Sequence, residues 1–340
     1  MKLGYIGMVA LAVAGCAFGQ AKDHPPTSYA FNGSLVAPDA RWDLLAVDPD
    51  HHRLYMARVG GVTTVDLMTG KVTATLIAMP LSHGVVPVGT TDLAVANDAK
   101  SNELVWFDGA TGKISARTRV GEEPDGVVYD PATKTVISIN ARDLTIVDAG
   151  TRQVLGSVPL RGEPEFGVVD DAGRLYDNIR DRHEIAVIDL RTRKVVGYRP
   201  LSKCEEPTGL AYDHRSGLLI AVCGSGMVKF VEARSGREIA SIPVGEGADA
   251  VILDAARRRV FIPSGHSGTL SIFSLDQPRT PMLIQTIKTR IGTRTGAVDP
   301  ATGKVYLPSA DFQVQKGREF PDVLPGTVRL MVLAPSPRRP

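Results

Sequence analysis

Residues 126–158 read GVVYDPATKTVISINARDLTIVDAGTRQVLGSV, four short runs separated by turns. The runs 126–129, 135–138, 144–147 and 154–158 are rich in Val, Ile, Thr and Tyr, which strands favour. Gly, Pro and Asp occupy the gaps, as tight turns require. No stretch of the chain shows a helical period of adequate length. The unit therefore predicts four antiparallel strands.

This pattern recurs seven times along the 340 residues. Its clearest copies carry an Asp-Pro turn at 48–49, 130–131 and 299–300. Third runs commonly end in an acid, at Asp66, Asp108, Asp148 and Asp189. Four-strand units repeating about every 40 residues are typical of β-propeller blades. We expect an all-β, seven-bladed β-propeller of four-stranded antiparallel blades, a single domain over residues 29–336.

The ends of the chain predict how the ring closes. The last copy supplies only three strands, the third ending near residue 332. The run 29–36, ahead of the first copy, resembles an outer strand. Pairing it with the last copy would complete the seventh blade, so we expect the N-terminal strand to close the ring. Residues 22–28 would be a linker and 337–340 a tail.

Residues 1–21 are interpreted as a signal peptide. Lys2 supplies the charge, and residues 3–15 form an apolar stretch too short for a stop-transfer helix. The sequence Val-Ala-Gly-Cys at 13–16 fits a lipobox, which would lipidate Cys16. Ordinary cleavage near residues 19–21 is the alternative. Either way the protein would be exported, periplasmic or secreted, with a lipid anchor as its one expected membrane contact.

The cysteine count and the net charge bear on the redox state and the partners of the protein. Cys204 and Cys223 remain in the mature chain, and an exported protein usually pairs two such cysteines. Pairing of 209–213 with 218–222 would bring them close, whereas their spacing fits no zinc signature. The formal net charge of +2 predicts no polyanion partner, so nucleic acid is not expected. We expect a monomer.

The repeat resembles the YVTN-type (YncE-like) seven-bladed β-propellers that bacteria export. The resemblance covers roughly residues 28–336. Its closest local matches are 96–97 before 102–105, 164–166, 204–210 with Cys223, and 294–295 before 299–300. The Tyr-Val-Thr-Asn tetrad itself is absent, so the repeat pattern alone carries the likeness. The resemblance implies a fold, and a fold licenses no reaction.

The positions that begin each inner strand should project toward the central channel. They are Asp43, His83, Asp125, Glu165, Thr208, Asp249 and Arg294, at intervals of 40 to 45 residues by subtraction. Six of these seven are ionisable, whereas the residues after each are mostly apolar. One interpretation is a ligand-binding channel mouth. The other is a hydrated channel whose carboxylates merely face water.

A divalent cation is the one cofactor that these residues suggest. Its expected ligands are Asp43, His83, Asp125, Glu165 and Asp249, because oxygen-rich sites suit such ions. Arg294 could clamp an anionic ligand. His183 and His266 should lie one loop further from the axis than His83, so a three-histidine site is not expected. The charged, Pro-containing segment 313–325 should form a loop over the mouth face, either a lid or a tolerated insertion.

Two functions remain open from the sequence. The first is an exported, non-catalytic propeller that binds a small ligand or an envelope protein at its channel mouth. The second is a metal-dependent propeller enzyme, lactonase-like or lyase-like, that uses the same residues. Convergence of the carboxylates and His83 on one cation would favour the second.

Overall fold

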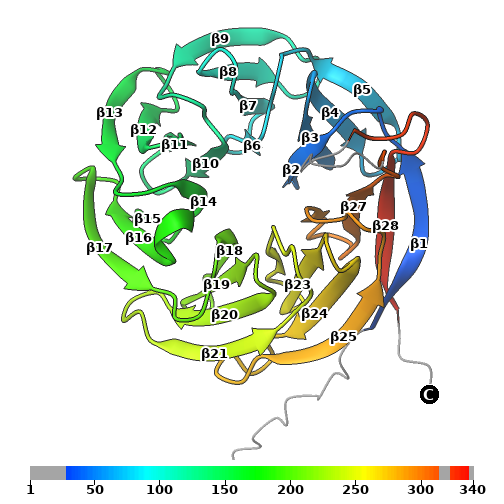
Figure 1. Ribbon diagram of the computed structural model, residues 1–340. Coiled ribbons are helices and arrows are strands. Elements are labelled where there is room, and N and C mark those ends of the chain that lie inside the picture. Colours follow the sequence, from blue (N-terminus) through cyan, green and yellow to red (C-terminus); the bar gives the residue numbers. More distant parts are fainter. Residues whose placement is uncertain (1–27, 314–321, 337–340) are drawn as a thin grey trace, which may run out of the picture.

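The computed structural model describes residues 28–313 and 322–336. Residues 1–27, with Cys16 and the predicted signal peptide, lie outside that part, as do 314–321 within the predicted mouth loop and the tail 337–340. The described residues form seven four-stranded antiparallel sheets arranged around a central channel (Figure 1). The seven-bladed β-propeller predicted from the repeat is confirmed.

Blades 1 to 6 each run from an inner strand to an outer one in chain order. Blades 1 to 3 are β2 (Trp42–Asp48), β3 (Arg53–Arg58), β4 (Gly61–Asp66) and β5 (Val72–Ile77); β6 (Val85–Pro87), β7 (Leu93–Asp98), β8 (Glu103–Asp108) and β9 (Ile114–Arg119); β10 (Gly126–Asp130), β11 (Thr135–Ile139), β12 (Asp143–Asp148) and β13 (Val154–Pro159). Blades 4 to 6 are β14 (Pro164–Val169), β15 (Arg174–Ile179), β16 (Glu184–Asp189) and β17 (Lys194–Pro200); β18 (Pro207–Asp213), β19 (Leu218–Cys223), β20 (Met227–Glu232) and β21 (Glu238–Pro243); β22 (Ile252–Asp254), β23 (Arg259–Ser264), β24 (Thr269–Ser274) and β25 (Met282–Lys288).

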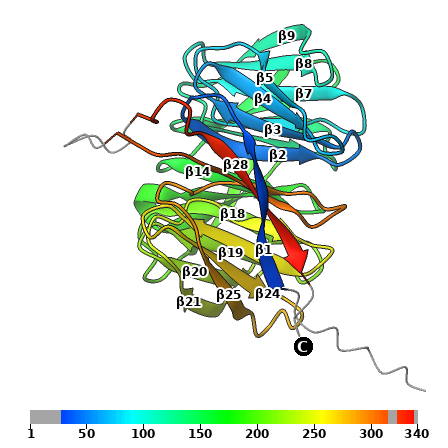
Figure 2. The ribbon, with the colours of Figure 1, turned by 90° about the vertical axis from the view of Figure 1, so that its right-hand side faces the viewer.

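The seventh blade joins the two ends of the chain, as predicted. It contains β26 (Ala297–Val298), β27 (Val305–Ser309), β28 (Arg329–Ser336) and β1 (Ser28–Val36). β1 lies antiparallel beside β28, with Ser28 opposite Ser336 (Figure 2). Gln285 of blade 6 also bonds β1, since its side chain accepts from Tyr29 N and donates to Tyr29 O, both at 2.9 Å. The ring is therefore closed by main-chain pairing between β1 and β28.

The core lies between blades. One cluster joins Ile137 and Ile146 of blade 3 to Leu175 and Ile188 of blade 4, all fully buried. Equivalent clusters lie at the other blade junctions. Burying each such side chain contributes about 1.5–3 kcal/mol. Because every blade shares its apolar faces with two neighbours, blade packing fixes where the inner strands begin.

One short helix is present in the described residues. It is the 3-10 turn η1 (Arg180–Arg182), at the channel-mouth end of blade 4. No helix of the described part of the chain is long and apolar enough to cross a lipid bilayer.

The predicted disulfide is confirmed. Cys204 and Cys223 are bonded, with their Cα atoms 5.2 Å apart, and Cys223 pairs with Pro207 in the ladder between β18 and β19. The bond ties the segment that leads into β18 to the end of β19. A loop of this size is stabilised by about 3 kcal/mol.

Candidate functional site

The seven predicted positions all lie at the same end of the inner strands, and we call them the mouth ring. Asp43, Glu165 and Thr208 are the second residues of β2, β14 and β18. His83 and Asp125 precede β6 and β10 by two residues and one, and Asp249 and Arg294 precede β22 and β26 by three each. The strand starts therefore differ from the predicted ones by up to three residues.

β-Bulges lie at three of these seven positions. In blade 1, Trp42 pairs with Arg58 and Leu45 with Met56, so three steps on β2 match two on β3. Blades 4 and 5 show the same extra residue, between the pairs formed by Pro164 and Gly167 and between those formed by Pro207 and Leu210. A bulge bends the strand and re-aims the side chains beside it, and bulges gather near functional rims. Asp43, Glu165 and Thr208 all lie inside such bulges.

Hydrogen bonds between neighbouring blades hold the backbone of the mouth ring. Leu44 N donates to His83 O at 3.0 Å. The buried Asn97 accepts from the backbone N–H groups of His83 and Gly84, both at 2.9 Å, and donates to Pro124 O at 3.0 Å. One amide side chain thus connects blade 2 to blade 3, and it fixes the backbone that carries His83.

The other blades use similar connections. Thr295 Oγ1 donates to Asp43 O at 2.9 Å, which links blade 7 to blade 1. Asn178 Nδ2 donates to Thr208 O at 2.6 Å, and Thr208 Oγ1 donates to Ala248 O at 2.9 Å. The hydroxyl of Thr208 therefore donates its hydrogen to the next blade. Its role is to support the backbone of the mouth ring.

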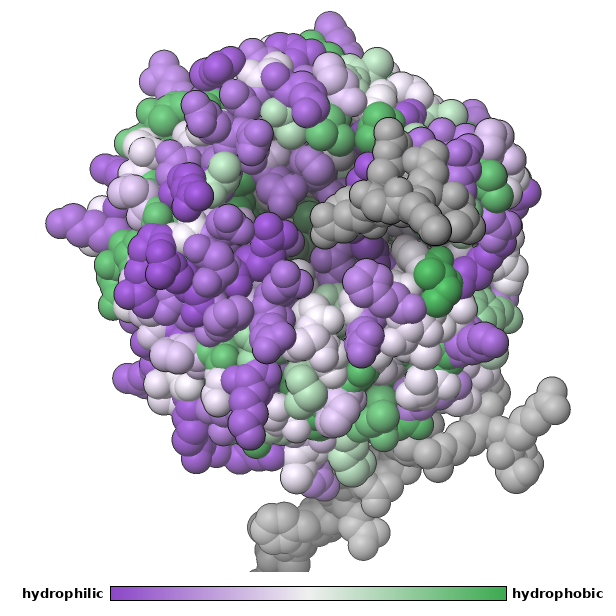
Figure 3. Space-filling model, in the orientation of Figure 1, coloured by the Kyte–Doolittle hydropathy of each residue, from purple (hydrophilic) through white to green (hydrophobic). Residues whose placement is uncertain are grey.

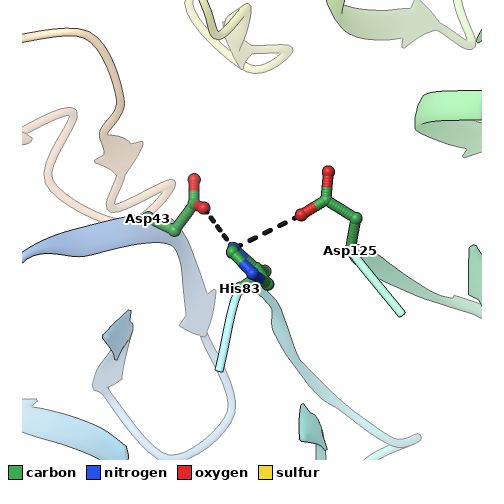
Figure 4. Close-up of side chains that lie close together, drawn as sticks. All are labelled: Asp43, His83 and Asp125. Carbon is green, nitrogen blue, oxygen red and sulfur yellow. Dashed lines mark hydrogen bonds and ion pairs between the residues drawn. The ribbon is translucent and has the colours of Figure 1, made fainter. Parts of the chain in front are cut away.

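Three side chains of the mouth ring meet directly (Figure 4). His83 Nδ1 lies 2.7 Å from Asp43 Oδ2 and 3.3 Å from Asp125 Oδ1. They come from blades 1, 2 and 3, and all three remain partly exposed to the channel. We call this group the Asp–His–Asp corner. In the described residues it is the one group in which three His, Cys, Asp or Glu side chains bring donor atoms within 4.8 Å of one another.

The remaining charged members form looser contacts. Arg294 lies between two acids, with Nη2 3.7 Å from Asp43 Oδ1 and Nε 3.4 Å from Asp249 Oδ2. Glu165 faces Arg180 of η1, whose Nη1 is 3.8 Å from Glu165 Oε2. Glu165 and Asp249, which the sequence placed in the same cation site, thus lie outside the Asp–His–Asp corner and contact arginines instead.

Asp125, Glu165 and Asp249 are harder to ionise than isolated carboxyl groups. Burial raises the pKa of Glu165 to about 8, and the charges of Asp125 and Asp249 act in the same direction. Burial likewise raises the pKa of Asp249 to about 6, although Arg294 opposes it. The pKa of Asp125 is also raised, chiefly by burial. Crowded carboxylates in a half-enclosed site disfavour one another's charge.

For His83, in contrast to these carboxyl groups, the surroundings favour the charged form. Burial by itself lowers the pKa of the imidazole, but the hydrogen bond to Asp43 and the charge of Asp125 overcome it and raise the pKa above its usual value. The cation form of His83 is thus stabilised by the two acids that contact Nδ1.

Two residues near the mouth ring escape sequence reasoning. Arg180 follows β15 in an Arg-Asp-Arg run, whose turn composition hides its role. Asp177 is fully buried within β15 and accepts from Glu165 N at 3.3 Å. Burial raises the pKa of Asp177 to about 8. The adjacent polar pair Asp177 and Asn178, inside a strand-forming run, is the signal that could have revealed it.

The surface around the mouth is hydrophilic (Figure 3). Beside the mouth ring, blades 4 to 6 form a hollow of about 600 Å³, lined by His183, Glu205, Glu206, Gly224, Ser225, Glu246 and His266. His83 is not among its lining residues. Deeper in the channel, a second hollow of about 340 Å³ has mostly apolar walls, including Val128, Val168 and Leu253. The second hollow is thus more apolar than the mouth, although Tyr212 and His214 also line it.

Comparisons with known proteins show the fold of this chain but neither its family nor its function. No family model and no curated protein matches the chain. A chain of hydrazine synthase from Kuenenia stuttgartiensis is similar with a TM-score of 0.71 and 16% identity, over 82% of this chain and 95% of that one. A chain of the mitotic checkpoint complex gives 0.73 and 14%, over 96% and 99%. The Cps50 (Swd1) propeller domain of Myceliophteria thermophila gives 0.72 and 12%, over 91% and 100%. At such identities only the propeller is shared, so the YVTN-type assignment stays a prediction.

Proposed function

We propose that this chain is an exported, monomeric β-propeller that binds a small ligand at its channel mouth and catalyses no reaction. One observation carries the proposal: ionisable residues about 40 positions apart converge on one rim, whereas the hollow lined by the inner strands has mostly apolar walls. A few polar groups at the mouth of a channel are the usual form of a specific binding site.

The charges of the mouth favour a ligand with a positive group. Four carboxyl groups, on Asp43, Asp125, Glu165 and Asp249, face two guanidinium groups, on Arg180 and Arg294. Glu165 is largely protonated at neutral pH, and a cation entering the mouth would favour its ionised form, whereas an anion would oppose it. Arg294 would then orient a negative group elsewhere on the same ligand.

Export and family belong to the same proposal. The predicted signal peptide supports export, and a disulfide is typical of oxidising compartments. The repeat pattern supports a YVTN-type propeller. Whether Cys16 carries a lipid would decide between a tethered and a released form.

A charge-sorted ligand panel tests the proposal. Melting temperatures would be measured with spermidine, arginine and choline, and with citrate and phosphate for comparison. At least one cation should raise the Tm of the wild type, and Asp249→Asn with Glu165→Gln should at least halve that shift. Glu246→Gln, on the same face but outside the mouth ring, is the matched control. Equal shifts in all variants, or none with any compound, would reject the proposal.

A metal-dependent enzyme is the second candidate, and the Asp–His–Asp corner is the observation that favours it. Such an enzyme would use a bound cation to polarise a carbonyl or leaving group. The purified protein loaded with Zn²⁺ or Mn²⁺ would be assayed on a panel of lactones. Turnover that disappears in Asp125→Asn would replace the binding function by a catalytic one.

A further inference from the structure

We infer that Asp43, His83 and Asp125 bind a divalent first-row transition-metal ion. The inference rests on the proposed function, because it names the cation that one corner of the mouth ring would hold. Two carboxylate oxygens and one imidazole nitrogen supply the donor set, and one atom from each lies within 4.8 Å of the other two.

The spacing of these atoms suits a small metal ion. Ions of this class bind nitrogen and oxygen at about 2.0–2.2 Å, so neighbouring ligand atoms lie roughly 3 Å apart and opposite ones roughly 4 Å apart. In the Asp–His–Asp corner, Nδ1 of His83 is 2.7 Å from one acid oxygen and 3.3 Å from the other. Nδ1 therefore occupies the middle position, with an acid oxygen on either side. Only small side-chain movements would bring all three onto one ion.

The backbone under each ligand is already fixed. His83 is held by Asn97 and by Leu44, Asp43 O accepts from Thr295, and Asp125 N donates to Ile139 O at 2.8 Å. These bonds come from neighbouring strands and blades rather than from the ligands' own turns. A site built on rigid elements loses less entropy on binding than one built on loops.

The surrounding charges leave the cation position accessible. Arg294 lies near Oδ1 of Asp43, whereas Oδ2 faces His83. The acids of the corner together can balance a double positive charge, and Asp249 lies against Arg294 on its other side. The guanidinium of Arg294 is thus held between Asp43 Oδ1 and Asp249 Oδ2, while Oδ2 of Asp43 remains directed at His83.

The donor set also predicts which ions bind. Imidazole nitrogen suits zinc, iron, cobalt and nickel, whereas Ca²⁺ and Mg²⁺ favour sites made of oxygen. Three protein ligands would leave coordination positions open toward the channel, as in metal sites that bind a further small molecule. The hollow lined by His183 and His266 is not an equivalent site, since its donors do not meet the same spacing.

The experiment is a metal titration of tag-free protein freed of metal with a chelator. Calorimetry with Zn²⁺ and visible absorption with Co²⁺ should both report one site, and Ca²⁺ and Mg²⁺ should bind more weakly. Asp125→Asn and His83→Gln should each raise the Kd at least about tenfold, since even indirect disturbance of metal ligands has that effect. His266→Gln, an exposed histidine on the same face, should leave the Kd unchanged.

The titrations distinguish failure of the metal site from failure of the binding function. If wild type binds no metal, or all variants bind Zn²⁺ alike, the metal inference is wrong. Asp125→Asn keeps the shape of its side chain, so it settles the matter should His83→Gln fail to fold. If spermidine or another organic cation binds while metals do not, the binding propeller survives and the metal site alone is rejected. If metals bind through the Asp–His–Asp corner and no organic compound binds, the metal site is supported and the binding of an organic cation is rejected.

Discussion

Carboxylates lie at both ends of the blades, at the channel mouth and at the opposite end, which we call the turn end. The pKa shifts of these carboxylates have opposite directions at the two ends. At the turn end, Asp148 Oδ1 accepts from Gly150 N at 3.0 Å, from Thr151 N at 2.7 Å and from Thr151 Oγ1 at 2.9 Å. These bonds lower the pKa of Asp148, with the backbone N–H of Thr151 as the main cause. At the mouth end, burial and neighbouring acids raise the pKa of Glu165 to about 8.

The difference lies in where the hydrogen-bond donors come from. A turn Asp finds its donors two or three residues ahead in its own segment, so ionisation is locally stabilised and stabilises the fold. A mouth acid faces acids of other blades and receives few donors. The turn carboxylates therefore stabilise the blades, whereas Asp125, Glu165 and Asp249 lie where burial disfavours their charge, as is typical of functional sites.

Breaking a buried turn carboxylate should have the largest effect. Asp213 ends β18 and is fully buried, and Arg258 Nη1 of blade 6 donates to its Oδ1 at 2.6 Å. Asp213→Ala should lower the free energy of unfolding by about 3–5 kcal/mol, because Arg258 would remain buried without its acid. Urea denaturation measures the change. A loss below about 1 kcal/mol would contradict this role of the turn end.

A matched pair sharpens the comparison. Asp130, also fully buried, accepts from Ala132 N at 3.0 Å and from Thr133 N at 3.1 Å. Asp130→Ala should cost about 1–3 kcal/mol, since those donors would lose their acceptor. Glu165→Gln should change stability by less than about 0.5 kcal/mol or increase it at neutral pH. If the mouth variant were the more damaging one in urea denaturation, the distinction between the two ends would be wrong.

The pH dependence of stability should show the most specific difference between the two ends. The pKa of Glu165 is about 8 in the folded protein and about 4.3 when unfolded. Between these values the folded state holds a proton that the unfolded state has lost, so the free energy of unfolding should fall as pH rises. Glu165→Gln should reduce this slope. Asp177, whose pKa is also about 8, should keep part of it.

An acid at the turn end is the control. Arg237 and Ser235 hydrogen-bond Glu232 and lower its pKa to about 2. Here the stabilisation is present above the unfolded pKa and is lost as pH falls from about 4 toward 2. Glu232→Gln should therefore alter only the acid limb of the curve. A Glu165→Gln variant whose slope between pH 5 and 8 matches wild type would refute the assignment of that slope to the mouth.

Local signals were enough to predict most of the fold. The Asp-Pro turns and the alternation of short strand-forming runs predicted the blades, and the strands of blade 3 end within one residue of the predicted runs. The run 29–36 was recognised as a closing strand because nothing else could complete the last blade. Cys204 and Cys223 followed from the pairing of two neighbouring strands.

The sequence predicted which positions form the candidate site, but it did not predict which of their side chains contact one another. Register identified all seven members of the mouth ring, but it could not separate Thr208, which bonds the next blade, from the acids that face the channel. It also grouped Glu165 and Asp249 with Asp43 and His83, although arginines from blades 4 and 7 lie beside them. The bulges that aim Asp43 and Glu165 leave no mark that periodicity can detect.

By itself, the sequence determined the number of blades, the strand order and which residues would meet at one rim. Those features depend on turns and strands within about ten residues, where local preference decides. Only the tertiary structure decided that Asp43, His83 and Asp125 converge while Asp249 is drawn to Arg294. These contacts join residues about 40 positions apart, and their distances depend on how neighbouring blades pack and where an inner strand bulges.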